Sequence, residues 1–368
     1  MIYIKVLHII SGNDNGGGAV HVLNICRCPS FENKICCIGE GELYSKALAM
    51  GIITVKYSLK ELIFNKLVEY VKKENIDILN FHGPKATFIH YFTKFRLKKP
   101  CVVTVHSDYR YDFLNNKIKH LFYTPISKIS LNSFDYYACV SQYIKDLLES
   151  KEFYGDKIVV NNGIDIKNIK ITKSRNEIRK EIGLSENNFT FVMVARMHPI
   201  KNHEKLLKTF KRLSNEFDNV KLLLVGDGEL ENQLKNQVNK TKLNDNVIFL
   251  GYRSNSLDYI NASDVSLLIS LNEGGAPPLV ILESGIVKKP VICSKVGDMG
   301  RIISDKNGFL INPYSEDSLY EKMKLSYLMK NKLNLLGENL YNDVVKKFSL
   351  ETFWNRYYCF YERILNTN

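Results

Sequence analysis

Short apolar runs, rich in β-branched residues, alternate with longer amphipathic stretches along the chain, and this alternation limits the fold more than any other feature of the sequence. Runs of this kind are typical of buried strands, and the stretches between them are long enough for helices. Buried strands that alternate with helices form a parallel sheet covered on both faces. In the first half of the chain the runs are IKVLHIIS (4–11), KICCIG (34–39), ITVKYS (53–58), DILNFHG (77–83), CVVTVHS (101–107), YYACVS (136–141) and KIVVNNGID (157–165).

The pattern starts again after the charged, helix-prone segment NIKITKSRNEIRKEIGLSENN (168–188). The sequence therefore predicts two doubly wound α/β domains, with a boundary between residues 166 and 186 that we place after residue 168. A chain of 368 residues can bury two separate cores, so we expect a cleft between the domains. The second set of runs is FTFVMVARM (189–197), VKLLLVGDGEL (220–230), NVIFLGY (246–252), DVSLLIS (264–270), PVICS (290–294) and GFLIN (308–312).

The composition is that of a globular protein, with 45% hydrophobic and 24% charged residues. No apolar run reaches the ~18 residues that a membrane-spanning helix needs. The N-terminus lacks a basic leader and a small-residue cleavage site, so we expect a cytoplasmic protein that is soluble or at most peripheral to a membrane. The chain ends in SLETFWNRYYCFYERILN (349–366), an aromatic amphipathic helix that Ser349 can cap.

Eight cysteines could indicate disulfides or a metal site. The clustered Cys26, Cys28, Cys36 and Cys37 do not have the paired C-x-x-C spacing of a zinc site, and a cytosolic chain keeps its thiols reduced. We expect unpaired, buried thiols and no metal.

A formal charge of +12 calls for an anionic partner or reflects solubility alone. One segment concentrates this charge and interleaves it with aromatic residues, a mixture that suits an anionic membrane surface or a phosphorylated lipid. A solvated basic face explains it equally well, and nucleic acid explains it less well because no binding motif accompanies it. The segment contains Lys85, Lys94, Arg96, Lys98, Lys99, Arg110, Lys117 and Lys119 against Asp108 and Asp112, with Tyr91, Phe92, Phe95, Tyr109, Tyr111 and Phe113 between them.

Ligands of doubly wound sheets bind beyond the carboxyl ends of the strands, so the residues just after each predicted strand are the candidates for a site. After the first strand, Gly16, Gly17 and Gly18 can present backbone N–H groups to a phosphate or a sugar hydroxyl, or can simply form a tight turn. His106 follows CVVTV and could hydrogen-bond a sugar hydroxyl, although most single histidines are structural. His82 is in the same situation and has less weight.

In the second half, Arg196 and Lys201 follow a buried strand and can point to one spot, as the charge of a diphosphate requires. Gly226 and Gly228 form a turn that either lets a nucleotide base lie near the backbone or only permits tight packing. Tyr252 and Arg253 follow a further strand, where a planar base could stack.

The stretch SLNEGGAPPLVILESG (270–285) places Glu273 and Glu283 on either side of a constrained turn. If a helix starts at its prolines, Glu283 lies a few residues into it and can accept hydrogen bonds from the vicinal hydroxyls of a ribose. Glu273 can hold a second polyol, with the N–H groups of Gly274 and Gly275 facing the same ligand. The pair would then provide one carboxylate for each sugar of a nucleotide sugar.

Taken in order, these motifs resemble those of the retaining glycosyltransferases of family 4, which have the GT-B fold. The resemblance runs from GGGAVHVL through VVTVHS, YYACVSQYI, VVNNGID, ARMHPIKNHEKLL, LLLVGDGEL, VIFLGYR and DVSLLISLNEGG to VILESGIVKKPVICSKVGD. It implies an acceptor-binding domain at 1–168, joined by a C-terminal helix at 350–368, and a donor-binding domain at 169–349.

The resemblance also implies roles for individual residues. Arg196 and Lys201 match the residues that bind the donor diphosphate, and Glu283 matches the one that binds the ribose. Glu273 lies nearest the glutamate that contacts the donor sugar, and His106 and the glycine loop lie around the reacting centre. The family has seven residues between its two glutamates, whereas nine separate Glu273 from Glu283; an alignment anchored at Glu283 puts Gly275 in the first glutamate's place.

The resemblance implies hexosyl transfer from a nucleoside diphosphate sugar, and a UDP-sugar is the donor that we expect first. The implied acceptor is a glycan or a polyprenyl-linked sugar in bacterial surface polysaccharide synthesis. The resemblance implies no cofactor and no divalent metal, in line with the lack of a D-x-D triplet. Two other functions stay open: a non-hydrolysing sugar-nucleotide epimerase and a catalytically silent GT-B binding module. A nicotinamide-dependent dehydrogenase is disfavoured because the G-x-G-x-x-G fingerprint is missing.

Overall fold

The structure is a computed structural model that describes residues 3–110, 117–273 and 277–367. The chain divides into two compact units. Unit 1 contains the described residues up to Gly163 together with those from Leu350 onward, and unit 2 contains Ile164–Glu273 and Pro277–Ser349.

Unit 1 is built on a seven-stranded sheet with the order β3-β2-β1-β4-β5-β6-β7, in which all neighbouring strands are parallel. The order reverses between β1 and β4, which makes this pair the topological switch point. Each apolar run predicted in the first half overlaps one of these strands, although β2 begins three residues before its run and β7 one residue before its run. They are β1 (Ile4–Ser11), β2 (Phe31–Ile38), β3 (Ile53–Tyr57), β4 (Ile78–His82), β5 (Cys101–Val105), β6 (Tyr136–Cys139) and β7 (Asp156–Val159).

Helices cover both faces of this sheet, and the side chains of β1 alternate between them. Leu7 and Ile9 pack in a core with α4, α5 and α7, whereas Val6 packs on the opposite face in a core with α16. The helices of unit 1 are α1 (Gly17–Cys26), α2 (Glu42–Ala49), α3 (Leu59–Glu61), the π-helix η1 (Leu62–Lys66), α4 (Leu67–Lys73), α5 (Pro84–Thr93), α6 (Lys117–Leu131), α7 (Gln142–Ser150) and α16 (Leu350–Thr367).

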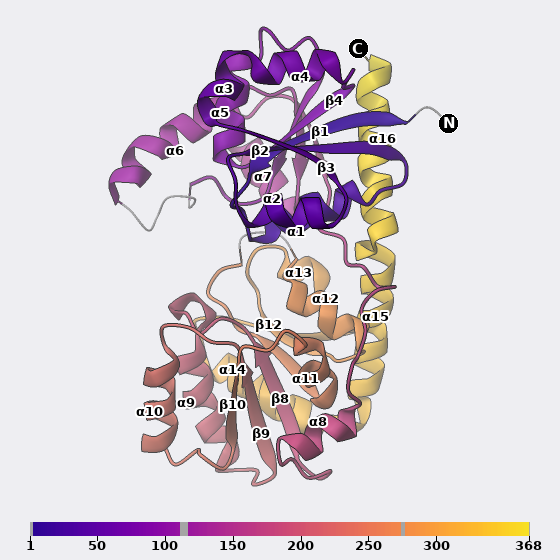
Figure 1. The fold of residues 1–368 in the computed structure, drawn as a ribbon. Coiled ribbons are helices and arrows are strands. Elements are labelled where there is room, and N and C mark those ends of the chain that lie inside the picture. Colours follow the sequence, from indigo (N-terminus) through magenta and orange to yellow (C-terminus); the bar gives the residue numbers. More distant parts are fainter. Residues whose placement is uncertain (1–2, 111–116, 274–276, 368) are drawn as a thin grey trace. The chain divides into compact units, whose positions relative to one another are not determined.

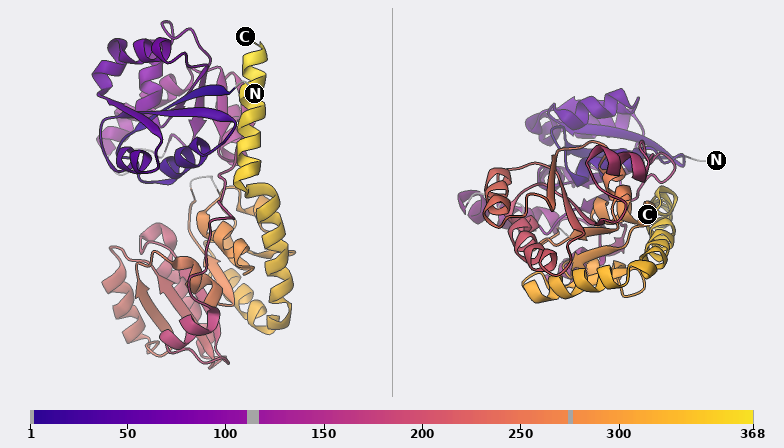
Figure 2. Two further views of the ribbon diagram at one scale, coloured as in Figure 1. Left: turned by 45° about the vertical axis from the view of Figure 1, so that its right-hand side comes forward. Right: turned by 90° about the horizontal axis from the view of Figure 1, so that it is seen from below.

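Helix α16 belongs to unit 1 although it ends the chain (Figures 1 and 2). Its buried stripe includes Phe353, Tyr357 and Tyr361, and the two tyrosine hydroxyls find partners on the strands. Tyr361 Oη accepts from Asn80 Nδ2 at 2.7 Å, and Tyr357 Oη lies 2.9 Å from Thr104 Oγ1. A helix of aromatic residues thereby completes one face of the sheet and satisfies its buried polar groups.

Unit 2 has a six-stranded parallel sheet with the order β10-β9-β8-β11-β12-β13, so its switch point lies between β8 and β11. The two doubly wound sheets confirm the predicted fold class. The strands are β8 (Phe189–Val194), β9 (Val220–Val225), β10 (Val247–Gly251), β11 (Val265–Leu268), β12 (Val291–Ser294) and β13 (Gly308–Ile311).

The helices of unit 2 begin with local capping signals where the sequence supplies them. Ser174 accepts from the backbone of Glu177 while Glu177 accepts from the backbone of Ser174, which forms a capping box at the start of α8. The helices are α8 (Arg175–Glu181), the 3₁₀ turn η2 (Pro199–Lys201), α9 (His203–Ser214), α10 (Glu231–Lys240), α11 (Ser256–Ala262), α12 (Leu279–Ile286), α13 (Met299–Ile302), α14 (Glu316–Leu328), the 3₁₀ turn η3 (Lys330–Lys332) and α15 (Leu333–Phe348).

The eight cysteines are free thiols, and most of them are buried, whereas Cys359 is exposed. Burial raises the pKa of the buried thiols, for example to about 12 for Cys37. Within the described residues, no helix combines the length and the apolar character that spanning a bilayer requires.

Candidate active site

The loop that follows β8 carries Arg196, and the turn that follows β9 holds this loop in place. Gly226 and Gly228 have positive φ angles of 135° and 150°. A Cβ on Gly226 would lie 2.2 Å from Ala195 O, and a Cβ on Gly228 would lie 2.6 Å from Met197 O. Met197 N also donates to Asp227 O at 2.7 Å. The two glycines are therefore explained by tight packing against the Arg196 loop, and a contact with a nucleotide base stays a prediction.

The guanidinium of Arg196 is exposed and has no hydrogen-bond or ion-pair partner among the described residues. Lys201, at the end of η2, differs: its Nζ lies 2.7 Å from Glu273 Oε1, and the two side chains are 24% and 12% exposed. The sequence assigned these two residues to different parts of a ligand, and it did not predict their ion pair. The structure brings them together across 72 positions of sequence.

Helix α12 carries Glu283 at the same edge of the unit 2 sheet. The helix begins at Leu279, with Pro278 as its N-cap residue, so the prolines precede the first turn. Gly285 holds α12 against α15, because a Cβ there would lie 2.6 Å from Val344 Cγ2. Burial raises the pKa of the Glu283 carboxyl. No described residue hydrogen-bonds or pairs with that carboxyl, which is an unusual state for a partly buried acid and fits a group that waits for a ligand.

The remaining predicted site residues of unit 2 are Tyr252 and Arg253, which the structure describes, and Gly274 and Gly275, which it does not. Tyr252 and Arg253 follow β10, and Tyr252 is 73% exposed. The guanidinium of Arg253 lies 5.9 Å from the ring centre of Tyr259. Gly274 and Gly275 lie outside the described residues.

In unit 1, the glycine loop after β1 lies against His106, which follows β5. Gly16 is the N-cap residue of α1, and its N–H donates to Asp14 Oδ1 at 2.9 Å. A Cβ on Gly18 would lie 3.7 Å from His106 Cδ2, whereas a Cβ on Gly17 would meet nothing within 4 Å. The structure therefore brings the predicted glycines and His106 to one place at the carboxyl ends of the strands.

His106 is the last of three histidines joined by hydrogen bonds, a feature that the sequence did not predict. His82 Nδ1 lies 3.0 Å from His106 Nε2, and His82 Nε2 lies 3.1 Å from His8 Nδ1. Burial lowers the pKa of His106 and of His8 to about 4, and it is the main cause that lowers the pKa of His82. Among the described residues, no group of three His, Cys, Asp or Glu side chains is arranged to hold a metal ion.

A fourth histidine, His21 on α1, packs edge-on against His106 with 4.9 Å between the ring centres. Its Nδ1 lies 2.7 Å from Asn162 Oδ1, and its Nε2 lies 2.7 Å from Tyr357 Oη. Burial is the largest cause that lowers the pKa of His21, to about 3. His8 and His21 were missed because each occurs alone in its motif. The available signal was that His8, His82 and His106 each lie in or directly after an apolar run, although only the register between β1, β4 and β5 brings them together.

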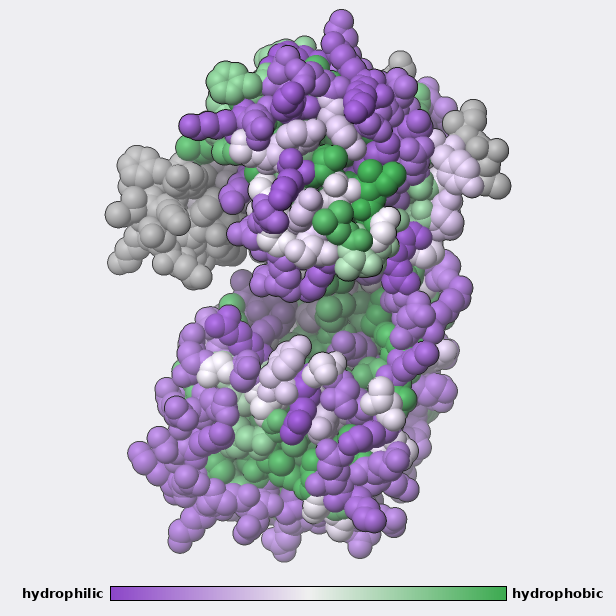
Figure 3. All heavy atoms as spheres, in the orientation of Figure 1, coloured by the Kyte–Doolittle hydropathy of each residue, from purple (hydrophilic) through white to green (hydrophobic). Residues whose placement is uncertain are grey.

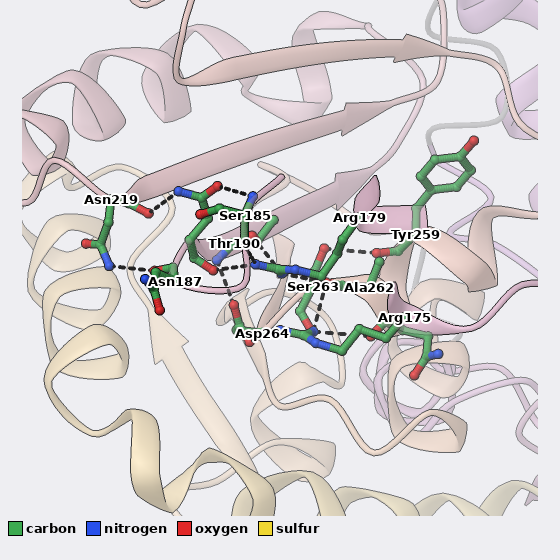
Figure 4. Close-up of polar contacts among 12 residues, drawn as sticks. Arg175, Arg179, Ser185, Asn187, Thr190, Asn219, Tyr259, Ala262, Ser263 and Asp264 are labelled. Atoms are coloured by element: carbon green, nitrogen blue, oxygen red, sulfur yellow. Dashed lines mark hydrogen bonds and ion pairs between the residues drawn. The ribbon is translucent and has the colours of Figure 1, made fainter. Parts of the chain in front are cut away.

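A cavity of about 420 Å³ lies at the edge of the unit 2 sheet where the strands begin, opposite the carboxyl ends. Its lining includes Arg175 and Asp264, which pair at 2.7 Å, and the neighbouring Arg179 donates to the carbonyls of Ala262, Ser185 and Asn188 (Figure 4). These charges are committed to backbone groups that tie α8 to the strands. They explain the cavity as part of the scaffold, so the candidate site stays at the carboxyl ends.

Two family profiles match the chain. The profile of the family described as glycosyl transferases group 1 matches residues 174–343, and that of glycosyltransferase family 4 matches residues 51–168. Together they cover the candidate site residues from His82 to Glu283, whereas the glycine loop precedes both matches.

Curated relatives and solved structures agree with these matches. The chain is 29% identical to UDP-Gal:alpha-D-GlcNAc-diphosphoundecaprenol alpha-1,3-galactosyltransferase of Escherichia coli, over 82% of this chain and 79% of the relative. It is 26% identical to alpha-monoglucosyldiacylglycerol synthase of Streptococcus pneumoniae, over 83% of this chain and 70% of the relative.

Among solved structures, HepE of Anabaena in complex with UDP superposes with a TM-score of 0.81 at 20% identity, covering 96% of this chain and 98% of that one. A glycosyltransferase from Rickettsia africae gives a TM-score of 0.81 at 19% identity, with both chains covered completely. These two likenesses are likenesses of fold. With the two profiles and the curated relatives, they lead to one conclusion: the chain belongs to the family 4 glycosyltransferases of the GT-B fold.

Proposed function

We propose that this enzyme moves a hexosyl group from a UDP-sugar to a hydroxyl of a glycan or lipid-linked acceptor, in the synthesis of a bacterial surface polysaccharide. The relatives support the choice of substrates, since one is named for a UDP-galactose donor and a diphosphoundecaprenol acceptor and another for a glycolipid product. We further propose that the transfer retains the anomeric configuration and needs no divalent metal.

The observation that carries this proposal is a pair of charged groups at the carboxyl edge of the unit 2 sheet that have no partner among the described residues. The exposed guanidinium of Arg196 can grip two oxygens of a diphosphate, and the partly buried carboxyl of Glu283 can accept from two ribose hydroxyls. Lys201 would balance the departing diphosphate together with Arg196, which is the work that a metal ion does in other transferases.

Glu273 has two functions in this proposal. Its carboxylate fixes the Lys201 ammonium at 2.7 Å, and its second oxygen remains to accept from a hydroxyl of the donor sugar. An ion pair that is mostly buried keeps the lysine side chain in one position, so the cation meets the diphosphate without first losing side-chain entropy. Within unit 2, the proposed donor contacts also include the turn glycines Gly226 and Gly228 and the neighbours Tyr252 and Arg253. Within unit 1, we assign the binding of a substrate hydroxyl or phosphate to the glycine loop (Gly16, Gly17, Gly18) and His106.

We also propose contact with an anionic membrane through an aromatic basic patch on η1, α5 and the residues that follow α5. Phe95 is 86% exposed and Phe64 is 74% exposed, while the ammonium of Lys94 lies 4.9 Å from the ring centre of Phe95. On the face drawn in Figure 3, hydrophobic groups interrupt the hydrophilic surface on the side where Figure 1 places α3 and α5. The patch consists of Phe64, Tyr91, Phe92, Lys94, Phe95, Lys98 and Lys99.

Several members of the basic segment predicted from sequence do not belong to this patch. Tyr109 is 7% exposed because it packs in the core of unit 1, and Arg110 pairs with Asp108 at 2.6 Å. Arg96 hydrogen-bonds the carbonyls of Ile63 and Phe64, so it ties η1 to α5. Tyr111, Asp112 and Phe113 lie outside the described residues, as do the side chains of Lys117 and Lys119.

The test incubates the full chain with UDP-glucose, UDP-galactose or UDP-N-acetylglucosamine and a synthetic GlcNAc-diphospho-polyprenol, in EDTA and then in magnesium. We expect UDP release in proportion to acceptor consumed, an unchanged rate in EDTA, and a product whose anomeric proton has the donor's configuration. Interconversion of UDP-sugars without acceptor would instead establish an epimerase. Donor binding without turnover, seen as thermal stabilisation of ~2.7 kcal/mol at a hundredfold excess over Kd, would point to a silent module.

A further inference from the structure

The three hydrogen-bonded histidines of unit 1 continue to a fourth residue, Asn33 on β2. His8 Nε2 lies 3.0 Å from Asn33 Oδ1, which completes a row from Asn33 through His8 and His82 to His106. His8 and His82 are 0% and 2% exposed. We call this row the histidine row. It crosses β2, β1 and β4 and ends just after β5, at the carboxyl edge of the sheet.

Asn33 gives the histidine row a direction. Its Nδ2 donates to the carbonyl of Ile25 at 3.1 Å, so its Oδ1 faces His8 and can only accept. His8 must therefore carry its proton on Nε2. A neutral imidazole has one N–H, so His8 Nδ1 is an acceptor and the proton between His8 and His82 belongs to His82 Nε2.

The same step repeats once more along the histidine row. His82 has its proton on Nε2, so its Nδ1 accepts, and His106 Nε2 must donate to it across 3.0 Å. His106 is then left with a lone pair on Nδ1. The neutral state that this requires is supported by burial, which lowers the pKa of His8 and of His106 to about 4.

Within the described part of the chain, His106 Nδ1 is the one ring nitrogen of the histidine row without a hydrogen-bond partner. No hydrogen bond joins Nδ1 to any described residue, and His106 as a whole residue is partly exposed. Gly18 lies near the Cδ2 edge of the ring, and His21 packs against it edge-on. Because two sides of the ring are covered by protein and Nε2 is engaged, Nδ1 is the nitrogen left for a ligand.

We propose that Asn33, His8 and His82 are positioning residues that hold His106 as its Nε2–H tautomer, so that Nδ1 accepts a hydrogen bond from a substrate hydroxyl. This inference deepens the proposed function and rests on it for the identity of the hydroxyl, which belongs to a sugar. A hydroxyl that meets the opposite tautomer faces an N–H donor. The histidine row thereby selects the direction of the hydrogen bond before any substrate arrives.

The tautomer can be read directly by nuclear magnetic resonance without any activity assay. Protein labelled with ¹⁵N-histidine is examined by long-range proton–nitrogen correlation at neutral pH, and the His106 signals are assigned by their loss in His106→Gln. We expect His8, His82 and His106 each to show a protonated Nε2 and an unprotonated Nδ1. A His106 protonated on Nδ1, or present as a mixture of both tautomers, would overturn the proposal whatever the enzyme transfers.

Two substitutions of His82 test whether its acceptor matters for turnover. An asparagine places its Oδ1 about where the histidine has Nδ1, so His82→Asn keeps an acceptor for His106, whereas His82→Leu removes it. We expect His82→Leu to lower kcat about tenfold with the donor KM within about twofold, and His82→Asn to recover most of that loss. Equal losses in both variants would contradict the positioning role.

The matched control is His90, a buried histidine of unit 1 outside the histidine row, whose Nδ1 lies 2.9 Å from Ser133 Oγ. His90→Leu removes a buried imidazole as His82→Leu does, and we expect kcat to stay unchanged. If neither His82 variant folds, the resonance experiment on the unmodified protein still decides the tautomer. A wild-type chain with no transferase activity but with the expected tautomers would refute the proposed function and leave the assignment of the histidine row intact.

Discussion

The first six strands of unit 1 and the six strands of unit 2 follow the same order in their parallel sheets. The polar groups at the carboxyl ends of the strands nevertheless differ between the two units. In unit 1 the polar groups are the buried histidines of the histidine row, which burial keeps neutral. In unit 2 they are charged: the guanidinium of Arg196, the pair of Lys201 with Glu273, and the carboxyl of Glu283. A charged edge suits an anionic diphosphate, whereas a neutral edge with fixed donors and acceptors suits hydroxyls.

The largest expected consequence of this difference is an acid sensitivity of unit 1. Burial lowers the pKa of His8 to about 4 and is the main cause that lowers the pKa of His21 and His90 to about 3, against about 6.5 in an unfolded chain. Between pH 6.5 and 4 the unfolded chain binds protons that the folded unit does not. The free energy of unfolding therefore has its full value above pH 6.5, where these histidines are neutral in both states. It falls as the pH is lowered below 6.5, by about 1.4 kcal/mol per pH unit for each such histidine.

The single tryptophan of the chain makes this measurable in unit 1. Trp354 on α16 donates from Nε1 to Asn24 O at 2.8 Å, so its fluorescence reports the unfolding of that unit. We expect the urea midpoint seen by Trp354 to fall steeply from pH 7 to pH 5, and His90→Leu to flatten the slope by about one proton. A midpoint that is the same at both pH values would mean that the histidines are not held neutral.

The next largest effect should come from removing the cations of unit 2. We expect Arg196→Ala with Lys201→Ala to lower kcat/KM at least about a thousandfold and to weaken UDP binding, because the double variant removes both cations that are proposed to balance the departing diphosphate. Lys201→Ala alone also leaves Glu273 without its ion pair, which should cost about 1 kcal/mol of unfolding free energy, while Arg196→Ala should cost none. Unchanged turnover would refute the diphosphate assignment.

The control for the charge itself is a second pair of exposed lysines in unit 2. Lys208 on α9 and Lys240 on α10 are both exposed. Lys208→Ala with Lys240→Ala removes the same formal charge away from the strand ends, so transfer should continue at the normal rate.

Replacing Glu283 should have a smaller effect on activity than removing the two cations. It should weaken the binding of the UDP-sugar while it stabilises the ligand-free fold. Glu283→Gln removes charged hydrogen bonds to the ligand, each of about 1.5 to 3 kcal/mol, so the Kd of the UDP-sugar measured by calorimetry should rise at least tenfold. Burial raises the pKa of this carboxyl, so its charge destabilises the ligand-free fold at neutral pH. Glu283→Gln should therefore raise the melting temperature at pH 7, and the gain should disappear below the unfolded-state pKa of about 4.3. An unchanged Kd would place Glu283 outside the site.

The sequence was sufficient for features that depend on neighbouring residues in the chain. The runs that became β1 to β13 are periodic and apolar, and the strand ends then placed Gly16, His106, Arg196 and Glu283 at the correct edges. It was insufficient for features that depend on register between strands. His8 and His82 lie 74 positions apart and meet only because β1 pairs with β4, a partnership that no local pattern encodes.

Side-chain burial outside the sheets was equally hard to predict. Tyr109 and Phe95 occur in one aromatic, basic segment, yet Tyr109 is 7% exposed and Phe95 is 86% exposed. Composition alone cannot separate a ring that packs under a sheet from a ring that faces solvent, since both are equally apolar. The distinction depends on where the chain turns after β5, and for this reason the proposed aromatic basic patch contains fewer residues than the basic segment of the sequence.

The smallest expected effect concerns the proposed aromatic basic patch. If the patch binds anionic membranes, unit 1 has a membrane affinity that unit 2 should lack. Each lysine near an anionic bilayer contributes about 1 kcal/mol, so Lys98→Glu with Lys99→Glu should reduce sedimentation with phosphatidylglycerol vesicles by roughly one to two orders of magnitude in partition coefficient. The same reversal at Lys208 and Lys240 of unit 2 should have little effect. Phe95→Ser should weaken binding further at high salt, where screening removes the charge contribution but leaves the burial of the ring. If both lysine reversals reduce sedimentation equally, the attraction is that of net charge alone, and unit 1 carries no dedicated membrane-contact surface.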